Sequence, residues 1–127
     1  MNPRFPLFLL SKDSDELATF NSIQEMQYQL ERIDVENQEY RAWDSNGLEV
    51  ALFVKEPAWL HLSTDPDGSS INELREAVTR YASNVGITID HSLPLETIGV
   101  MIQQIRNEQE RKALERSPIR RFFSRFK

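Results

Sequence analysis

The residues of this sequence that could do chemistry are two histidines and several clusters of carboxylates. His61 and His91 are thirty residues apart, and neither has a second histidine or a cysteine at the spacing of a metal site. The runs 65–68 and 13–16 carry closely spaced Asp residues like those of calcium loops. Neither run continues into the longer pattern that ends in a bidentate Glu. We therefore expect turns at both runs, and neither a metal nor a cofactor.

Acid–base catalysis needs two carboxylates, or a carboxylate and a histidine, held together with separated pKa values. Asp34, Glu36 and Glu39 form the densest acidic set, and charged runs of this kind usually form a solvated surface. The four glycines lie at turns, at a helix cap or within a helix, so they build neither a phosphate loop nor a nucleotide-binding fingerprint. Because no catalytic signature is present, we expect that the chain is not an enzyme.

Aromatic residues in neighbouring predicted strands form a second kind of candidate site. Alternation over residues 48–55 places Phe53 opposite an apolar row, so Phe53, with Trp43 or Trp59 beside it, lines the other face of the sheet. If helices cover only the apolar row, these side chains and the acidic set above mark a protein-binding surface. If helices cover both faces, the aromatic residues belong to the core.

The end of the sequence differs from the rest in composition. Ser117 and Pro118 are typical of a helix N-cap and first helical position. At helical spacing, the residues after them place an apolar stripe on one side of a helix and cationic residues on the rest of its surface. This tail, residues 117–127, has the candidate contact residues Ile119, Arg120, Arg121, Phe122, Phe123, Arg125 and Phe126. Three interpretations stay open: the tail folds onto its own domain, lies in an anionic membrane surface, or docks in a groove of a partner protein.

Charge divides the sequence into two parts. Residues 111–127 hold seven Lys or Arg and one Glu, a net charge of +6, whereas residues 1–110 carry −11. An acidic body repels phosphates, so we expect no nucleic-acid binding by the body and favour a basic partner. The absence of cysteine excludes disulfides and suits the cytoplasm. The N-terminal apolar run is too short for a signal peptide, and no run reaches the length of a transmembrane helix.

The elements that must position these residues follow from periodicity and turn signals. Strands are predicted at 7–11, 17–20, 39–44, 48–55 and 58–63, with a further brief strand at 87–90. Helices are predicted to begin after Ser22, after Ser70 and near Pro94. The order β-β-α-β-β-β-α-(β)-α plus basic tail predicts an α+β fold. We expect one domain over residues 1–116, with a mainly antiparallel sheet of four or five strands and two or three helices packed on one face.

From Phe8 the sequence predicts a strand, an acidic turn, a second strand and a short helix. The segment Ile33-Asp-Val-Glu-Asn-Gln-Glu-Tyr40 comes next and leads into a strand and the turn at Gly47. This stretch resembles a segment of small, uncharacterised bacterial proteins. The resemblance covers about the first third of the chain and contains no catalytic motif. It implies a bacterial, cytoplasmic, stand-alone domain, and it transfers no site residues.

Together these features favour a non-enzymatic protein-interaction module of the immunity, inhibitor or adaptor type. Its expected contact elements are the cationic tail and the aromatic or acidic surface. The alternative is a peripheral membrane adaptor that binds anionic lipid through the tail, and a third candidate is a small enzyme or ligand-binding domain. The identity of a protein partner and the oligomeric state, with a homodimer among the options, stay open.

Overall fold

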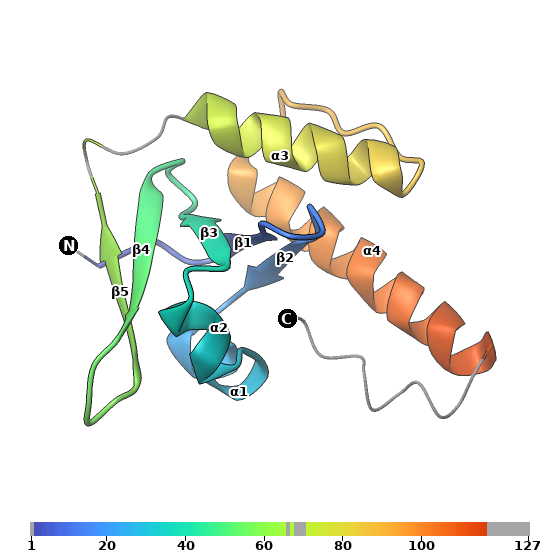
Figure 1. The fold of residues 1–127 in the computed structure, drawn as a ribbon. Coiled ribbons are helices and arrows are strands. Elements are labelled where there is room, and N and C mark those ends of the chain that lie inside the picture. The colour runs from blue at the N-terminus through green and yellow to red at the C-terminus, as the bar shows by residue number, and fades with distance from the viewer. Residues whose placement is uncertain (1, 66, 68–70, 117–127) are drawn as a thin grey trace.

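A computed structural model describes residues 2–65, 67 and 71–116, with side chains described as far as residue 113. Within this part the chain forms five strands and four helices. In chain order they are β1 (Leu7–Ser11), β2 (Leu17–Phe20), α1 (Ile23–Gln29), α2 (Arg32–Glu36), β3 (Tyr40–Trp43), β4 (Glu49–Val54), β5 (Leu60–Thr64), α3 (Ile71–Asn84) and α4 (Leu95–Arg116). The prediction of an α+β fold with an antiparallel sheet is confirmed (Figure 1).

The five strands form one sheet in the order β2-β1-β3-β4-β5, and every neighbouring pair is antiparallel. The turn between β3 and β4 contains Gly47, whose φ of +82° is a conformation that glycine adopts without strain. The Asp44 carboxylate accepts hydrogen bonds from the backbone N–H groups of Asn46 and Leu48, at 2.9 and 3.1 Å. This turn therefore fixes the β3–β4 register, in which Ala42 lies opposite Val50 and Trp43 opposite Glu49.

Helices cover both faces of the sheet, which corrects the expectation of helices on one face. On one face, α1 and α2 pack with alternate strand residues that include Leu7 and Leu9. On the other face, α3 and α4 pack with the intervening residues, including Phe8 and Leu10 (Figure 1). The physical reason is in β1, where all five residues are buried. A strand that is apolar at consecutive positions must be covered on both sides.

Two further elements differ from the expectation. Residues 32–36 form helix α2, where no helix is predicted above, and this helix buries Val35 against the sheet while Ile33 stays exposed. Residues 87–90 form no strand, although Ile89 is buried in the cluster under α3 and α4. In each place one apolar residue, Val35 or Ile89, packs into a core cluster without belonging to a strand.

Helix α4 lies against β2 at one edge of the sheet. Gly99 of α4 faces the sheet here, and a Cβ at this position would lie 3.4 Å from both Phe8 and Pro6, within ordinary van der Waals contact. The Thr19 hydroxyl of β2 donates a hydrogen bond to the Gly99 carbonyl at 3.2 Å. Strand β5 forms the opposite edge of the sheet, far from α4 in Figure 1.

Candidate interaction surface

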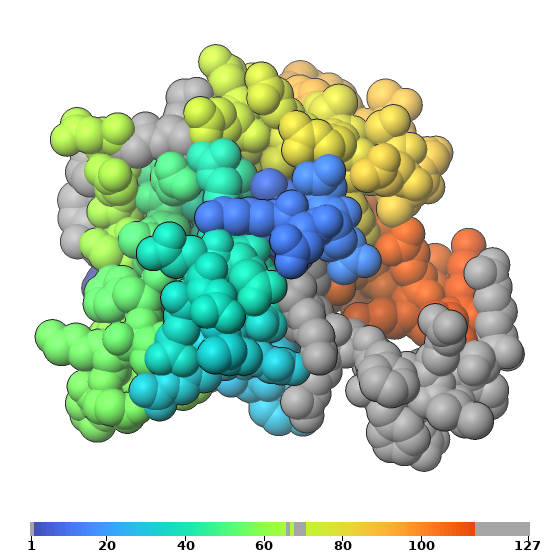
Figure 2. All heavy atoms as spheres, viewed as in Figure 1, coloured from blue at the N-terminus to red at the C-terminus, as the bar shows by residue number. Residues whose placement is uncertain are grey.

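The part of the sheet that α3 and α4 leave uncovered lies on β4 and β5. The cluster beneath these two helices contains residues of β1, β2 and β3 but none of β4 or β5. Because side chains alternate along a strand, one face of β4 and β5 thus points past the helices. We call this the open face, and it consists of Glu49, Ala51, Phe53, His61 and Ser63. Figure 2 shows β4 and β5, in green, forming one flank of the molecule away from α4.

Phe53 and His61 form the centre of the open face. They are directly opposite each other in the β4–β5 ladder, and their rings stack with centroids 5.5 Å apart and an interplanar angle of 18°. The His61 Nε2 atom lies 2.9 Å from the Lys55 carbonyl oxygen, which holds the imidazole in place. Phe53 remains 42% exposed. A fixed, half-exposed aromatic pair is the kind of surface that anchors protein contacts.

Arg41 lies between the open face and α3. Its guanidinium bonds to Glu49 on β4, with an N–O distance of 3.1 Å, and to Glu73 on α3. The same group lies over the ring of Trp43, 4.8 Å from the centroid. Burial disfavours the charge, but the hydrogen bonds to Glu73 and Glu49 outweigh it and raise the pKa of Arg41. This network fixes the border of the open face.

Trp43 does not contribute to the open face, which corrects its place among the candidate surface residues and fits the alternative in which it belongs to the core. It lies on the same side of the sheet as Phe53, but it is fully buried in the cluster beneath α3 and α4. Trp59 is half-buried and packs against the cluster on the α1–α2 side. Of the three aromatic candidates, only Phe53 lies on this surface. Sequence spacing gives His61 no metal-binding neighbour, and only the β4–β5 register pairs it with Phe53.

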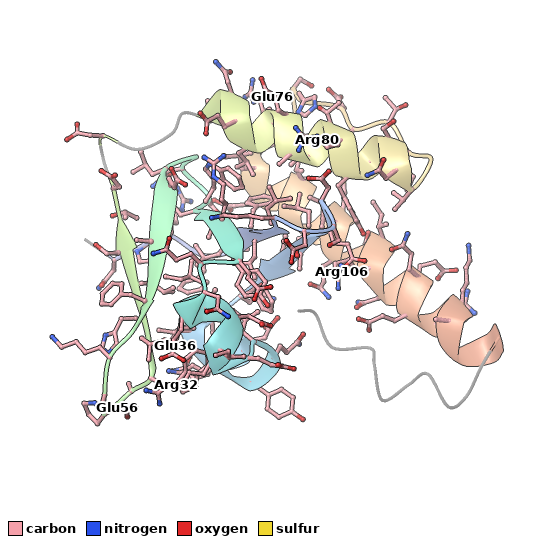
Figure 3. The ribbon with its side chains drawn as sticks, in the orientation of Figure 1. Arg32, Glu36, Glu56, Glu76, Arg80 and Arg106 are labelled. Carbon is pink, nitrogen blue, oxygen red and sulfur yellow. The ribbon has the colours of Figure 1, made fainter. Side chains whose placement is uncertain are left out.

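The acidic candidates lie on and after α2. The Tyr40 hydroxyl lies 3.3 Å from a carboxylate oxygen of Asp34, and burial together with Asp34 raises the pKa of Tyr40. Burial and then Asp34 also raise the pKa of Glu39. Glu36 is exposed on α2, near Arg32, which forms an ion pair with Glu56 in the turn between β4 and β5 (Figure 3). The structure thus brings Asp34 and Glu39 together.

A polar hollow of about 250 Å³ lies between α1, β2 and α4. It contains Glu110, whose pKa lies above the ordinary value because burial raises it by more than the charge of Arg106 lowers it. Arg106, which is labelled in Figure 3, also donates to the Leu17 carbonyl of β2, at an N–O distance of 3.5 Å. These groups could position a small polar ligand.

Several expectations concern parts outside these surfaces. The tail and all seven of its candidate residues lie outside the described residues. Among the side chains that the structure describes, no group of three or more metal-binding residues occurs. None of the described helices combines the length and apolar character needed to cross a membrane.

Comparisons with known proteins return no match: no family model fits the chain, and neither a curated protein nor a solved structure is significantly similar to it.

Proposed function

We propose that this chain is a non-enzymatic protein-interaction module and that the open face is its contact surface. The observation that carries the proposal is the Phe53–His61 stack, an ordered aromatic pair left half-exposed where the neighbouring sheet is covered. Removing such a ring from water is favourable by roughly 1.5–3 kcal/mol. The hydrogen bond between His61 and Lys55 limits the entropy that the pair would lose on binding.

Charge favours a basic partner, as for an immunity protein, an inhibitor or an adaptor. Residues 1–110 carry a net charge of −11, and Asp34, Glu36 and Glu39 contribute to it. An acidic body speeds encounter with a basic protein, and salt weakens this attraction. A bacterial cytoplasmic setting agrees with the resemblance at residues 33–40 and with the absence of cysteine.

A pulldown from cells that produce the chain tests this proposal. We expect one salt-sensitive partner, retained by the wild type and by Tyr28→Ser, which alters an exposed aromatic residue of α1. Phe53→Ser should lose it, and charge reversal at Asp34, Glu36 and Glu39 should weaken it. The proposal is wrong if no salt-sensitive partner is found, or if Phe53→Ser retains the partner fully.

The second candidate, a peripheral membrane adaptor, is favoured by the composition of the tail. If the tail were helical, the sequence spacing would place Phe122, Phe123 and Phe126 on one stripe with Ile119 and the cationic residues on the rest of the surface. Each basic residue near an anionic membrane contributes about 1 kcal/mol. That sum supports reversible attachment.

The third candidate, a ligand-binding domain or small enzyme, is supported by the polar hollow between α1, β2 and α4. Arg106 and Glu110 would contact a small polar ligand there. A metabolite screen by thermal shift tests this candidate, because a ligand held at this position should raise the melting temperature of the wild type more than that of Arg106→Met.

A further inference from the structure

The two edges of the sheet are covered differently. At β2, the Leu17 carbonyl points away from β1 and accepts a hydrogen bond from Arg106 of α4. At β5, no strand of the described chain pairs with the outer side. An edge with unpaired peptide groups is a template for another strand. Natural edges are commonly protected by charged residues, proline or a bulge, and β5, with the sequence LHLST, has none of these.

The pairing of β5 with β4 determines which peptide groups point outward. The Lys55 N–H donates to the Trp59 carbonyl at 3.1 Å, and the Asp65 N–H donates to the Glu49 carbonyl at 2.9 Å. Since bonded residues alternate along an antiparallel ladder, the peptide groups of residues 61 and 63 also face β4. The N–H and C=O groups of Leu60 and Leu62 therefore face away from β4.

We propose that β5 pairs with β5 of a second copy of this chain, antiparallel, about a twofold axis at His61. In this register Leu60 of each copy lies opposite Leu62 of the other, and the two pairs exchange their outward N–H and C=O groups. His61 faces its counterpart across the axis in a non-hydrogen-bonded pair, where Cα atoms are about 4.5 Å apart. The result is a continuous sheet across the two copies.

A second copy fits this edge because it closes the assembly. The combined sheet would begin and end with β2, and α4 lies against β2 in each copy. The twofold pairing uses the β5 edge of both copies, so the assembly would stop at two copies. β5 contains no charged side chain, so the twofold axis brings no like charges face to face within the strand.

The open face supplies a further reason. A twofold axis perpendicular to the sheet keeps both open faces on the same side. The Phe53–His61 stack of one copy would then continue into that of the other, giving a row of four rings. Aromatic neighbours across strands stabilise a sheet by roughly 0.2–1 kcal/mol for each pair. The two copies can pair without the proposed protein partner. Pairing would, however, double the area of open face that is available to such a partner.

One strand pair buries less surface than a standard protein interface, so self-association should be of micromolar strength or weaker. Both copies are acidic, with a net charge of −5 each, so salt should strengthen their association. Salt should weaken the binding of a basic partner. This opposite response separates failure of the dimer from failure of the proposed function.

The test uses the full chain in sedimentation velocity, from micromolar to near-millimolar concentration. We expect a concentration-dependent dimer in the wild type. His61→Lys places two ammonium groups opposite each other and should weaken association about tenfold. His91→Lys is the matched control, because it makes the same change at the only other histidine, and it should associate like the wild type.

Disulfide trapping tests the register without relying on a charged variant. The chain contains no cysteine, so His61→Cys introduces a single thiol. Its counterpart would lie within the Cα distance that a disulfide requires, so mild oxidation should link two copies, whereas His91→Cys should stay unlinked. A wild type that stays monomeric, dimerisation of His61→Lys at wild-type strength, or equal linking of the two cysteine variants would each overturn the proposal. If the β5 edge binds a different protein and not a second copy, the purified wild type would stay monomeric, and the proposal would be overturned.

Discussion

The guanidinium carbon of Arg41 lies 4.8 Å from the ring centroid of Trp43, so one arginine joins the buried core to the border of the open face. Arg41 also bonds to Glu49 and Glu73. We expect Arg41→Met to lower the free energy of unfolding by about 1 kcal/mol, a modest value because the side chain is about one-third exposed. Arg41→Lys should restore less than half of the loss, since lysine lacks the planar fork. Urea unfolding measures both variants. A full rescue by lysine would contradict the stacked geometry.

Trp43 and Phe53 lie on the same side of the sheet but should respond differently to truncation. Trp43 is fully buried, so Trp43→Ala should destabilise the chain by about 3–5 kcal/mol. Phe53 is 42% exposed, so Phe53→Ala should cost about 1 kcal/mol or less. Parallel thermal and urea unfolding measure the two costs. Similar values for both variants would mean that Phe53 is covered and that the open face does not exist.

This difference between the two aromatic residues shows where sequence reasoning stops. Alternation in 48–55 and the Asn46–Gly47 turn suffice to place Phe53 opposite the apolar row, because both are local properties of the chain. Whether a helix covers a given part of a sheet face depends on the tertiary path of α3. Parity therefore cannot separate Trp43, which α3 and α4 cover, from Phe53, which they leave open.

Other elements follow the same rule. The sequence predicts the N-cap of α1 at Ser22, and the Ser22 hydroxyl accepts a hydrogen bond from the Glu25 N–H at 3.1 Å. The stacking of His61 on Phe53 was not readable, because it depends on the register set by the turn between Lys55 and Trp59. The apolar run of β1 indicates that both faces of the sheet are covered. It does not indicate which helices cover which face.

Glu39 should make stability depend on pH. Burial and Asp34 raise its pKa above the ordinary value of 4.5 in the folded chain, so folding favours the protonated form. This contribution to stability is present at low pH and is lost as pH rises through the window above 4.5. Glu39→Gln should therefore raise the melting temperature at neutral pH and change it little below about pH 4. Glu36→Gln, on the exposed side of α2, is the control. A melting temperature that falls at neutral pH in Glu39→Gln would contradict this account.

Gly47 should accept a side chain only at a larger cost in stability than Gly86. Its φ is +82°, and a Cβ would lie 2.8 Å from the Cβ of Ile71 at the start of α3. Gly86 has a similar φ of +79° with open space around it. We expect Gly86→Ala to cost about 1 kcal/mol from the backbone alone, and Gly47→Ala to cost about twice as much or more. Equal costs, measured by urea unfolding, would show that α3 does not lie against this turn.

The membrane alternative makes a separate prediction about the tail. In the full chain, Ser at positions 122, 123 and 126 removes three aromatic anchors and keeps every charge. If the tail binds lipid, the wild type should co-sediment with anionic vesicles and the triple variant should not, with neutral vesicles as the control. Equal recovery of the two proteins would eliminate this alternative.

The most direct test of the open face as a protein-binding surface is site-specific photo-crosslinking in the cells that produce the chain. A photoreactive phenylalanine analogue replaces Phe53 in one protein and Tyr28, the most exposed of the large apolar side chains described, in another. We expect a discrete adduct with a basic protein from position 53 and none of that mass from position 28. If position 53 gives no adduct, or if both positions give the same products, the open face is not the contact surface.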